Sequence, residues 1–565
     1  MNHRRRHPAA LVLVAVVFGA PPAAVPNDLV ARGTHGVVVS AEPHATQVGL
    51  DVLRTGGNAV DAAVAVALTL AVTHPQAGNL GGGGFLLLRM ADGRTAAIDF
   101  RERAPKAATP DLYLRADGSV DSDRVQFGAS AAGVPGSPAG LLFALHKYGT
   151  RSLPKVAEPA IRLAREGFAI DQFLAADLAD AAAALGRYPS TRAVFFRDDR
   201  PLQQGDVLVQ SDLAATLERY AEHGFDGFYG GETAAKITAQ MERDGGHVTA
   251  ADLAAYDVRE RDALRGSYRG YDVIGMPPPS SGGVALLQML GLLAPFDLRE
   301  LGFGGSEYDH LLTEVMRRAY ADRSRWLGDP DHVAVPTPGL LDADYLRQLG
   351  AGIRRDRKSE VRPGQPPGGK DSDDTTHFSV VDAAGNAVAC TTTINSTFGS
   401  LLVVDGAGFF LNNEMDDFSA KPGTPNQFGL IGGKANAIAP GKRMLSSMTP
   451  TIVVRDGQLC CVLGAPGGGR IITAVLQVLL NRIDHGMDLE RAVRAPRIHH
   501  QWLPDEIVWE PLALSPDVRA ALARKGHTFA ANPRQIGRVM AIEVLPSGER
   551  IGVCDHRSGG SAAAY

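Results

Sequence analysis

The sequence predicts a mixed α/β protein whose first part is rich in helices and whose second part is rich in strands. Three observations lead to this fold class. Residues 150–330 carry mostly helical periodicity, residues 354–374 are charged and rich in proline and glycine, and short apolar and β-branched runs follow them. The middle segment is typical of a flexible linker, so we expect it to divide the two parts.

Composition places the chain among turn-rich globular proteins. Its 565 residues include 57 Lys and Arg against 62 Asp and Glu, which gives a formal charge of −5. This near-balance argues against a nucleic-acid partner, because binding phosphates needs a surplus of positive charge. The 64 glycines and 35 prolines show no repeat, and 45% hydrophobic residues are enough to bury a large core.

The N-terminus has the features of an export signal. Three arginines at positions 4–6 precede an apolar run at Ala9–Ala20, and small residues and prolines follow it. We expect residues 1–24 to be a signal peptide and the mature protein to be periplasmic or secreted, without membrane contact after signal removal. The run is too short to span a bilayer, although an uncleaved membrane anchor would show a similar pattern.

The elements of the first part can be assigned in chain order. Residues 45–73 predict helical structure interrupted by Gly56-Gly57-Asn58, and the glycines at 81–84 lead into a strand at Phe85–Leu88. These glycines precede a strand and lack a following Lys-Ser/Thr, so they do not match a phosphate-binding loop. Further helix signals are two capping-box-like starts, Thr249–Asp252 and Ser306–Asp309, and an apolar segment, Val284–Leu293, after the turn Met276–Gly283.

The second part predicts a series of strands and a helix at Ile471–Leu480. The strand candidates are His377–Asp382, Ala387–Asn395, Val403–Leu411, Pro450–Val454, Cys460–Gly464, Ile507–Trp509 and Val539–Val544. The first two are separated by four residues and predict a hairpin. If Asp382 pairs with Ala387, Thr375 lies opposite Ile394 and within one residue of Thr393 and Asn395.

The cysteines and paired histidines do not predict a metal site or a disulfide framework. No pair of cysteines has the spacing of a zinc site, and adjacent cysteines on a strand would point to opposite faces. We expect the cysteines to be buried, small apolar residues, and we expect His499 and His500 to be structural. The cysteines are Cys390, Cys460, Cys461 and Cys554.

Thr375 stands where the linker ends and a strand begins. A threonine hydroxyl is a weak nucleophile unless a base lies near it. Cleavage of the Asp374–Thr375 bond would give Thr375 a free α-amine, whose ordinary pKa of about 7.7–8 suits a base. The hydroxyl would attack the preceding carbonyl to form an ester, which water would then hydrolyse. The pattern alone does not establish this, because Thr-Thr after a linker is common.

Six segments, in chain order, resemble the γ-glutamyltransferase family (γ-glutamyltranspeptidases) of N-terminal-nucleophile hydrolases. They are Thr73-His-Pro-Gln-Ala-Gly-Asn-Leu-Gly-Gly-Gly-Gly84, Asp99-Phe-Arg-Glu102, Thr375-Thr-His-Phe-Ser-Val-Val-Asp382, Asn412-Asn-Glu-Met-Asp-Asp-Phe-Ser419, Leu445-Ser-Ser-Met448 and Gly464-Ala-Pro-Gly-Gly-Gly469. The resemblance implies an αββα sandwich, with two stacked, mainly antiparallel sheets flanked by helices. It also implies a heterodimer cut from one precursor, with residues 25–374 as the large subunit and 375–565 as the small subunit in one structural unit.

The resemblance assigns the reacting groups. It implies that Thr375 is the autoprocessing residue and the nucleophile, and that Thr393 hydrogen-bonds it. Gly467 and Gly468 match the oxyanion hole of the family, where two backbone N–H groups can approach an oxyanion because no side chain intervenes.

The donor site of the family has groups for both ends of an amino acid. A γ-glutamyl group carries an α-carboxylate and an α-ammonium, so its site needs hydrogen-bond donors for one and acceptors for the other. The resemblance implies donors to the carboxylate from Arg101, Ser446 and Ser447. It implies acceptors for the ammonium from Asn395, Glu414 and Asp417.

The implied reaction transfers the γ-glutamyl group of glutathione or a related γ-glutamyl amide to Thr375, then to water or to an amino acid or dipeptide acceptor. No metal or organic cofactor is expected. The segment Pro422–Arg443 resembles the lid of the family, with Phe428 where many members have Tyr. Related glutaryl-cephalosporin acylases generally lack this loop. Two further functions fit the same motifs: processing of poly-γ-glutamate, and binding of γ-glutamyl compounds by an exported protein without turnover.

Overall fold

Two seven-stranded antiparallel sheets form the centre of the molecule, whose computed structural model describes residues 28–366 and 377–565. The first sheet has the spatial order β1 (Val30–Gly33), β19 (Arg550–Cys554), β18 (Met540–Val544), β15 (Gln458–Gly464), β14 (Thr451–Arg455), β11 (Tyr271–Gly275), β10 (Leu264–Tyr268). The second has the order β20 (Ser561–Ala564), β2 (Val37–Ser40), β12 (Phe378–Val381), β13 (Ala387–Thr393), β3 (Gly83–Arg89), β4 (Thr95–Phe100), β9 (Arg259–Arg261).

Strands such as β2, β3 and β12 are buried on both faces, which explains their nearly continuous apolar sequences. In β2, Val37 and Val39 pack between the two sheets, whereas Val38 packs against helices. In β3, Phe85 points toward the other sheet and Leu86 toward the helices. This alternation follows from the two-residue period of a strand.

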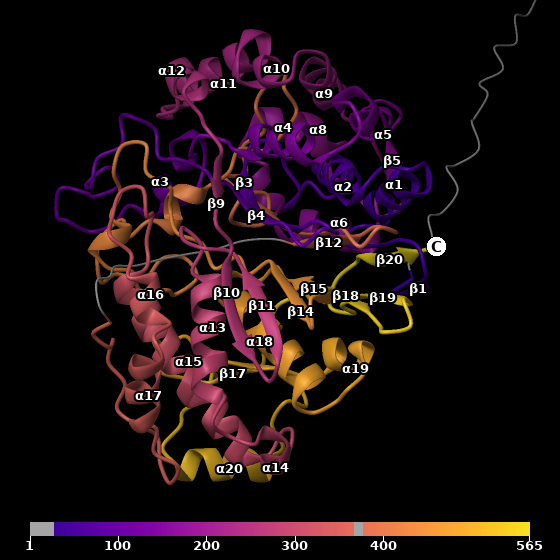
Figure 1. The fold of residues 1–565 in the computed structure, drawn as a ribbon. Helices are drawn as coiled ribbons and strands as arrows, with labels where there is room; N and C mark the ends of the chain where they lie inside the picture. Colours follow the sequence, from indigo (N-terminus) through magenta and orange to yellow (C-terminus); the bar gives the residue numbers. More distant parts are fainter. Residues whose placement is uncertain (1–27, 367–376) are drawn as a thin grey trace, which may run out of the picture.

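Helices cover the outer face of each sheet (Figure 1). Those on the second sheet's side include α1 (Pro43–Arg54), α2 (Ala59–Thr73), α4 (Ser137–Tyr148), α5 (Leu153–Glu166), α9 (Ser211–His223), α10 (Phe225–Tyr229), α11 (Gly231–Asp244) and α12 (Ala250–Ala254). Those on the first sheet's side include α13 (Gly282–Leu293), α14 (Leu298–Leu301), α15 (Ser306–Trp326), α17 (Ala343–Ala351), α18 (Ile471–Ile483), α19 (Leu489–Arg494) and α20 (Pro516–Arg524). The expected αββα sandwich is therefore confirmed.

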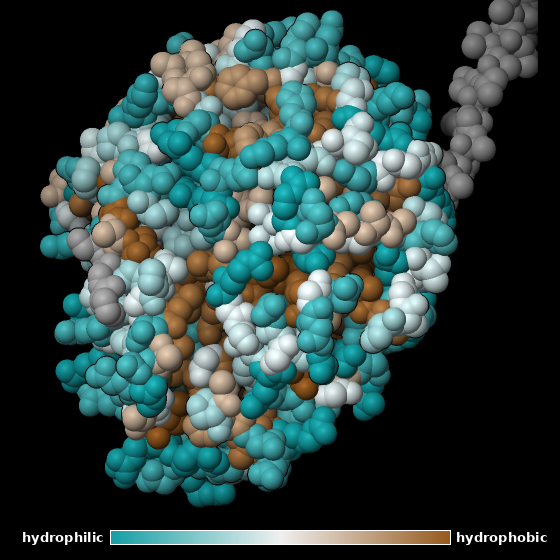
Figure 2. Space-filling model, viewed as in Figure 1, coloured by the Kyte–Doolittle hydropathy of each residue, from teal (hydrophilic) through white to brown (hydrophobic). Residues whose placement is uncertain are grey.

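Shorter elements complete the layers. They are the helices α3 (Ser122–Gln126), α6 (Gln172–Asp180), α7 (Ala182–Leu185), α8 (Pro189–Phe195) and α16 (Thr337–Leu340), and the paired short strands β5 (Phe168–Ala169) with β8 (Val207–Leu208), β6 (Phe196–Arg197) with β7 (Arg200–Pro201), and β16 (Ile498–His499) with β17 (Val508–Trp509). On the face shown in Figure 2, hydrophilic residues cover much of the surface, and hydrophobic residues show between them in narrower areas. In the described part of the chain, no helix combines the length and apolar character needed to cross a bilayer.

Both sheets combine strands from before and after position 375. The second sheet places β12 and β13 between β2 and β3, and the first places β11 beside β14. The helix-rich and strand-rich parts of the sequence are thus not separate domains. The expected signal peptide, residues 1–24, lies outside the described residues.

Several expectations for single elements need correction. The capping box at Thr249 is confirmed, but α15 has Gly305 as its N-cap and no side-chain cap, so the box expected at Ser306 is wrong. Residues 403–411 form no strand, because Gly406 (φ 69°) and Gly408 (φ 80°) turn the chain there. The expectation of mostly helical structure also missed the hairpin of β10 and β11.

The hairpin of β12 and β13 is shifted by one residue from the expected register. Val381 pairs with Ala387 and Phe378 with Cys390. The connection has five residues, 382–386, because the Asp382 carboxylate accepts the N–H of Asn386 at 2.9 Å and Gly385 adopts a φ of 86°. The four cysteines are free. Cys390, Cys461 and Cys554 are buried as expected, whereas Cys460 is only partly buried.

Candidate active site

His377 lies immediately before β12 and two residues after the predicted nucleophile in the sequence. Asp374 and Thr375 themselves lie outside the described residues. The buried His377 ring has Nδ1 2.9 Å from Thr391 Oγ1 and Nε2 3.0 Å from Ser379 Oγ. Burial lowers the pKa of His377 to about 3, so the ring is neutral at physiological pH. Gly464 leaves room for it, since a Cβ there would collide with the imidazole.

Thr393 ends β13 and is held by hydrogen bonds on both sides. Its Oγ1 accepts the N–H of Asn395 at 2.7 Å, and its carbonyl accepts Asn79 Nδ2 at 2.8 Å. Gly82 must be glycine, because a Cβ would collide with the same carbonyl. The positioning role of Asn79 was missed, although the residue lies inside the glycine-rich segment that carried the resemblance.

Asn395 presents a hydrogen-bond acceptor next to Thr393. It adopts a left-handed φ of 73°, and its Nδ2 donates to the Asn413 carbonyl at 3.0 Å. Its Oδ1 is buried and has no hydrogen-bond partner among the described residues. A buried acceptor of this kind favours a ligand with an N–H group.

Arg101 lies at the centre of a fully buried cluster of charges. Its guanidinium lies 2.8 Å from the Glu414 carboxylate, 2.6 Å from Asp417 and 3.5 Å from Glu102. Its Nε donates to the Met444 carbonyl at 3.1 Å. The structure therefore brings together Arg101, the expected cation of the donor site, with Glu414 and Asp417, two of its expected acceptors. In this structure Arg101 forms ion pairs with both carboxylates.

The cluster has more carboxylates than cations. Burial raises the pKa of Asp417 to about 6 and that of Glu102 to about 8, with Arg101 opposing both shifts. Burial also raises the pKa of Glu414. Burial alone would lower the pKa of Arg101, but the three carboxylates more than offset it and raise it. Carboxyls with raised pKa values are partly protonated at neutral pH, and an additional cation bound beside them would favour their charged form.

The segment with Ser446 and Ser447 lies against this cluster. Arg101 also donates to the Leu445 carbonyl at 3.3 Å, and Arg323 Nη2 donates to Ser447 Oγ at 3.3 Å. Ser281, from the proline-rich turn before α13, donates its hydroxyl to the Ser446 carbonyl at 2.7 Å. Sequence reasoning missed Arg323 and Ser281, because their contacts join distant segments, and it assigned no role to Glu102, which lies inside one of the motifs.

Gly467 and Gly468 form the turn that leads into α18. Their φ angles are 139° and 61°, in the range that favours glycine. A Cβ on Gly467 would approach the Cα of Gly537 to 3.0 Å. The turn precedes a 13-residue helix, whose N-terminus is the end that favours negative charge.

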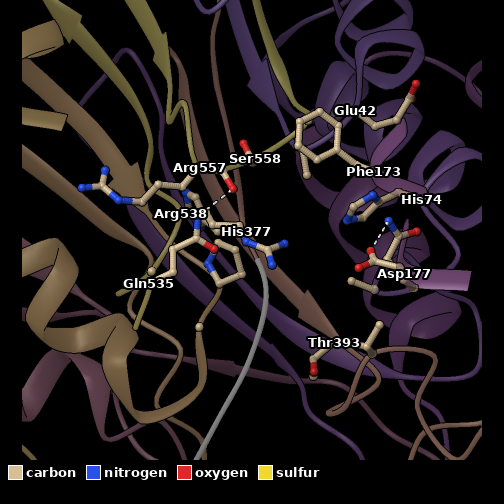
Figure 3. A pocket seen from close by; sticks show the side chains of 18 of the residues that line it. Glu42, His74, Phe173, Asp177, His377, Thr393, Gln535, Arg538, Arg557 and Ser558 are labelled. Atoms are coloured by element: carbon tan, nitrogen blue, oxygen red, sulfur yellow. Dashed lines mark hydrogen bonds between the residues drawn. The ribbon is translucent and has the colours of Figure 1, made fainter. Parts of the chain in front are cut away.

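A cavity of about 710 Å³ brings several expected site residues together (Figure 3). Thr393, Asn395, Gly467, Gly468 and Phe428 line it. The donor-site residues that are absent from its lining are Arg101, Glu414, Asp417, Ser446 and Ser447. The cavity therefore includes the expected reacting centre and leaves out the Arg101 cluster.

The segment expected to be a lid covers the other side of the cluster. Asn426 Nδ2 donates to the Asp417 carboxylate at 3.3 Å, and Ser396 Oγ donates to Gln427 Oε1 at 2.8 Å. The Phe428 carbonyl accepts Gln501 Nε2 at 3.2 Å. A small void beside Asp417 is bounded by Arg323 and this segment. Contacts of this kind can close a pocket over a ligand.

A group of potential metal ligands lies away from this cavity. In the described ranges, His310, Glu314 and His527 are close enough to share an ion. Glu314, however, already accepts hydrogen bonds from Arg317 at 2.8 Å and Arg318 at 2.7 Å. Two guanidinium groups at the carboxylate disfavour a metal cation there.

Comparison with known proteins gave consistent matches along the chain. The family model described as Gamma-glutamyltranspeptidase matches residues 45–565. The chain is 50% identical to the glutathione hydrolase proenzyme of Escherichia coli (strain K12), over 93% of this chain and 91% of that protein. It is 39% identical to the acylase ACY 1 proenzyme of Pseudomonas sp. (strain V22), over 94% of each.

Solved structures share the same fold. Cephalosporin acylase from Bacillus halodurans matches with a TM-score of 0.85 and 28% identity, over 98% of this chain and 99% of that chain. The gamma-glutamyltranspeptidase of Helicobacter pylori matches with a TM-score of 0.57 and 42% identity, over 61% of this chain and 97% of that chain.

Proposed function

Because this chain belongs to the gamma-glutamyltranspeptidase family, we propose that Thr375, released as an N-terminus by cleavage after Asp374, is its nucleophile. The protein is a γ-glutamyltransferase and glutathione hydrolase. Its reaction would pass through a γ-glutamyl ester on the threonine hydroxyl. Water or an amine would then take the γ-glutamyl group from this ester.

The register of the β12–β13 hairpin is the observation that carries this proposal. Val381 pairs with Ala387 and Phe378 with Cys390, so paired positions keep a constant sum. If β12 is continued three residues toward its N-terminus, position 375 falls opposite Thr393. Directly opposed residues on antiparallel strands have Cβ atoms about 4.5–5.5 Å apart. The Thr393 hydroxyl could therefore donate a hydrogen bond to the nucleophile.

Autoprocessing would use the same hydroxyl. Thr375 Oγ would attack the Asp374 carbonyl, and the peptide C–N bond would break as the ester forms. The proton would move to the released α-amine, and water would hydrolyse the ester to leave a free Asp374 carboxylate. The N–H groups of Gly467 and Gly468 would stabilise the oxyanion in each acyl-transfer step.

The charged cluster supports a γ-glutamyl donor. A bound α-carboxylate could replace Glu414 and Asp417 as partner of Arg101, with further hydrogen bonds from Ser446 and Ser447. The displaced carboxylates, with Asn395 Oδ1, could then accept from the α-ammonium. The ammonium would supply a second cation to the cluster and favour the ionised form of these carboxyls.

Acyl groups without an ammonium would suit this cluster less well. A glutaryl group has the length of a γ-glutamyl group but no α-amine, so it would leave the carboxylates without a partner. The presence of the lid segment and the higher identity to a glutathione hydrolase proenzyme than to an acylase proenzyme also favour γ-glutamyl donors. We expect γ-glutamyl p-nitroanilide to be cleaved at least 100-fold more efficiently than glutaryl p-nitroanilide.

We further propose that the mature form is a heterodimer of residues 25–374 and 375–565, exported after removal of residues 1–24. Both sheets interleave strands from the two sides of the cut. Cleavage would therefore leave the two chains joined by the ladder hydrogen bonds and by the core between the sheets.

Intact-mass spectrometry of three purified forms tests the nucleophile. The wild type should give two chains, the smaller beginning at Thr375. Thr375→Ala should remain one chain and lose at least 1,000-fold in anilide release. Thr375→Ser keeps the hydroxyl and should still be cut, although more slowly. An uncut wild type that is active, or a Thr375→Ala variant that is cut at the same bond, would contradict the proposal.

A further inference from the structure

The cavity has room for the half of the substrate that the donor site does not take. A γ-glutamyl amide extends to both sides of its scissile bond, and the Arg101 cluster would hold the γ-glutamyl side. Thr393, Gly467 and Gly468 line the 710 Å³ cavity, whereas Arg101 does not line it. The remaining cavity therefore lies on the side of the amine, either the leaving amine or the acceptor.

The two walls of this outer cavity carry opposite charges. Figure 3 shows His74 and Asp177 on one side and Gln535 and Arg538 on the other. Gln76 Nε2 donates to the Asp177 carboxylate at 3.2 Å and holds it in place. Arg538 lowers the pKa of Asp177 across the space, although burial raises it more. In the described part of the chain, Arg538 forms no ion pair with Asp177 or any other residue.

The backbone of Arg538 is fixed, while its guanidinium remains available. Its N–H donates to the Pro466 carbonyl at 3.3 Å, one residue before the Gly467 turn. The preceding Gly537 has a φ of 67° and packs against Gly467. The side chain is exposed and makes no hydrogen bond to a described residue. Arg557, on the same wall, is instead neutralised by Glu510 and Asp555.

We propose that Arg538 binds the free carboxylate of the amine half of the substrate, namely the dipeptide that glutathione releases and the amino acids or dipeptides that accept the γ-glutamyl group. This assignment rests on the proposed function. A guanidinium anchored beside the oxyanion turn would hold the carboxylate while the amine faces the ester. Water has no carboxylate, so Arg538 would favour transfer over hydrolysis.

Acceptor kinetics with a matched pair of acceptors test this assignment. The donor is γ-glutamyl p-nitroanilide, and the acceptors are glycylglycine and glycylglycinamide, which differ only in the terminal carboxylate. The wild type should prefer glycylglycine at least tenfold in kcat/KM. Arg538→Gln should raise the KM for glycylglycine at least tenfold and bring the preference close to one. Arg538→Lys should keep part of the preference.

Arg524→Gln is the matched control, because Arg524 is an exposed arginine at the end of α20, away from the cavity lining. It should behave like the wild type. Arg534 also lines the cavity, so Arg534→Gln tests whether that arginine anchors the carboxylate instead. Processing of each variant into two chains shows that it has folded.

The outcomes separate this assignment from the proposed function. A wild type that releases anilide but prefers neither acceptor would overturn the assignment alone. The same follows if Arg538→Gln keeps the preference or if Arg534→Gln abolishes it instead. A wild type that releases no anilide from the γ-glutamyl donor overturns the proposed function and, with it, this assignment.

Discussion

Arg101 and Arg538, the two arginines to which we assign the two halves of the substrate, occupy contrasting environments. Arg101 is fully buried and contacts three carboxylates and two backbone carbonyls. Arg538 is exposed and has no side-chain partner among the described residues. A buried charge interacts strongly because water does not screen it, but its geometry must fit closely. We therefore expect the donor end to be selective for one amino acid and the outer cavity to accept many amines.

Removing the Arg101 charge should have the largest effect. Arg101→Gln leaves Glu414 and Asp417 buried without a cation, which typically costs about 3–5 kcal/mol of folding stability. We expect the donor kcat/KM to fall at least 100-fold as well. Arg538→Gln should change the free energy of unfolding by about 0.5 kcal/mol or less, as is usual for exposed side chains. Urea unfolding and anilide release measure the two effects.

Arg101→Lys tests whether the site depends only on the positive charge of Arg101 or also on the geometry of its guanidinium. It restores the cation but not the planar fork that reaches Glu414 and Asp417 together. We expect it to recover part of the stability and little of the donor kcat/KM. Equal losses of stability in Arg101→Gln and Arg538→Gln would contradict the contrast between a buried, paired Arg101 and an exposed Arg538 without a side-chain partner among the described residues.

The sequence predicted local structure better than contacts between distant segments. Helix starts at Asn58 and Thr249 have capping residues within three positions, so local sequence predicts them. The contact of Arg323 with Ser447 joins residues 124 positions apart, and no local pattern encodes it. The one-residue shift of the β12 hairpin arose because Asp382 and Asn386 bond in the loop, which a residue count does not reveal.

The order of the strands in the two sheets is also not encoded by local sequence patterns. Alternation along β2 and β3 is visible as apolar runs, but it does not say which strand lies beside which. That β13 pairs with β3 depends on the glycines at 82 and 84, where a Cβ would collide with carbonyls of β13. The expected sandwich followed from the resemblance. The strand order was not predicted, because it is set by contacts between distant segments.

Donor binding should weaken in mild acid. Burial raises the pKa of Asp417 to about 6, so the carboxylate becomes protonated as the pH falls from 7 to 5. A neutral carboxyl binds an ammonium less well, and we expect the donor KM to rise several-fold over this range. Because the folded-state pKa is raised, protonation of Asp417 stabilises the folded protein. The rise in KM would therefore not result from unfolding.

Asp417→Asn is the check on this pH dependence. The amide does not titrate, so the donor KM of the variant should be high and nearly constant between pH 5 and 7. Glu102, Glu414 and Asp416 also titrate near this site, with pKa values that burial raises. A pH dependence that persists in Asp417→Asn would assign the effect to one of these carboxyls.

The smallest expected difference between the donor site and the outer cavity is the response of their KM values to salt. An exposed guanidinium is screened at high ionic strength, since the Debye length falls from about 10 Å at 0.1 M to about 3 Å at 1 M. Raising NaCl from 0.1 to 1 M should increase the KM for glycylglycine about two- to fivefold and leave that for glycylglycinamide unchanged. The donor KM should change less than twofold, because the Arg101 cluster is out of contact with solvent. A larger change in the donor KM than in the glycylglycine KM would mean that the donor site opens to solvent during turnover. The contrast between Arg101 and Arg538 would then hold only for the closed state of the enzyme.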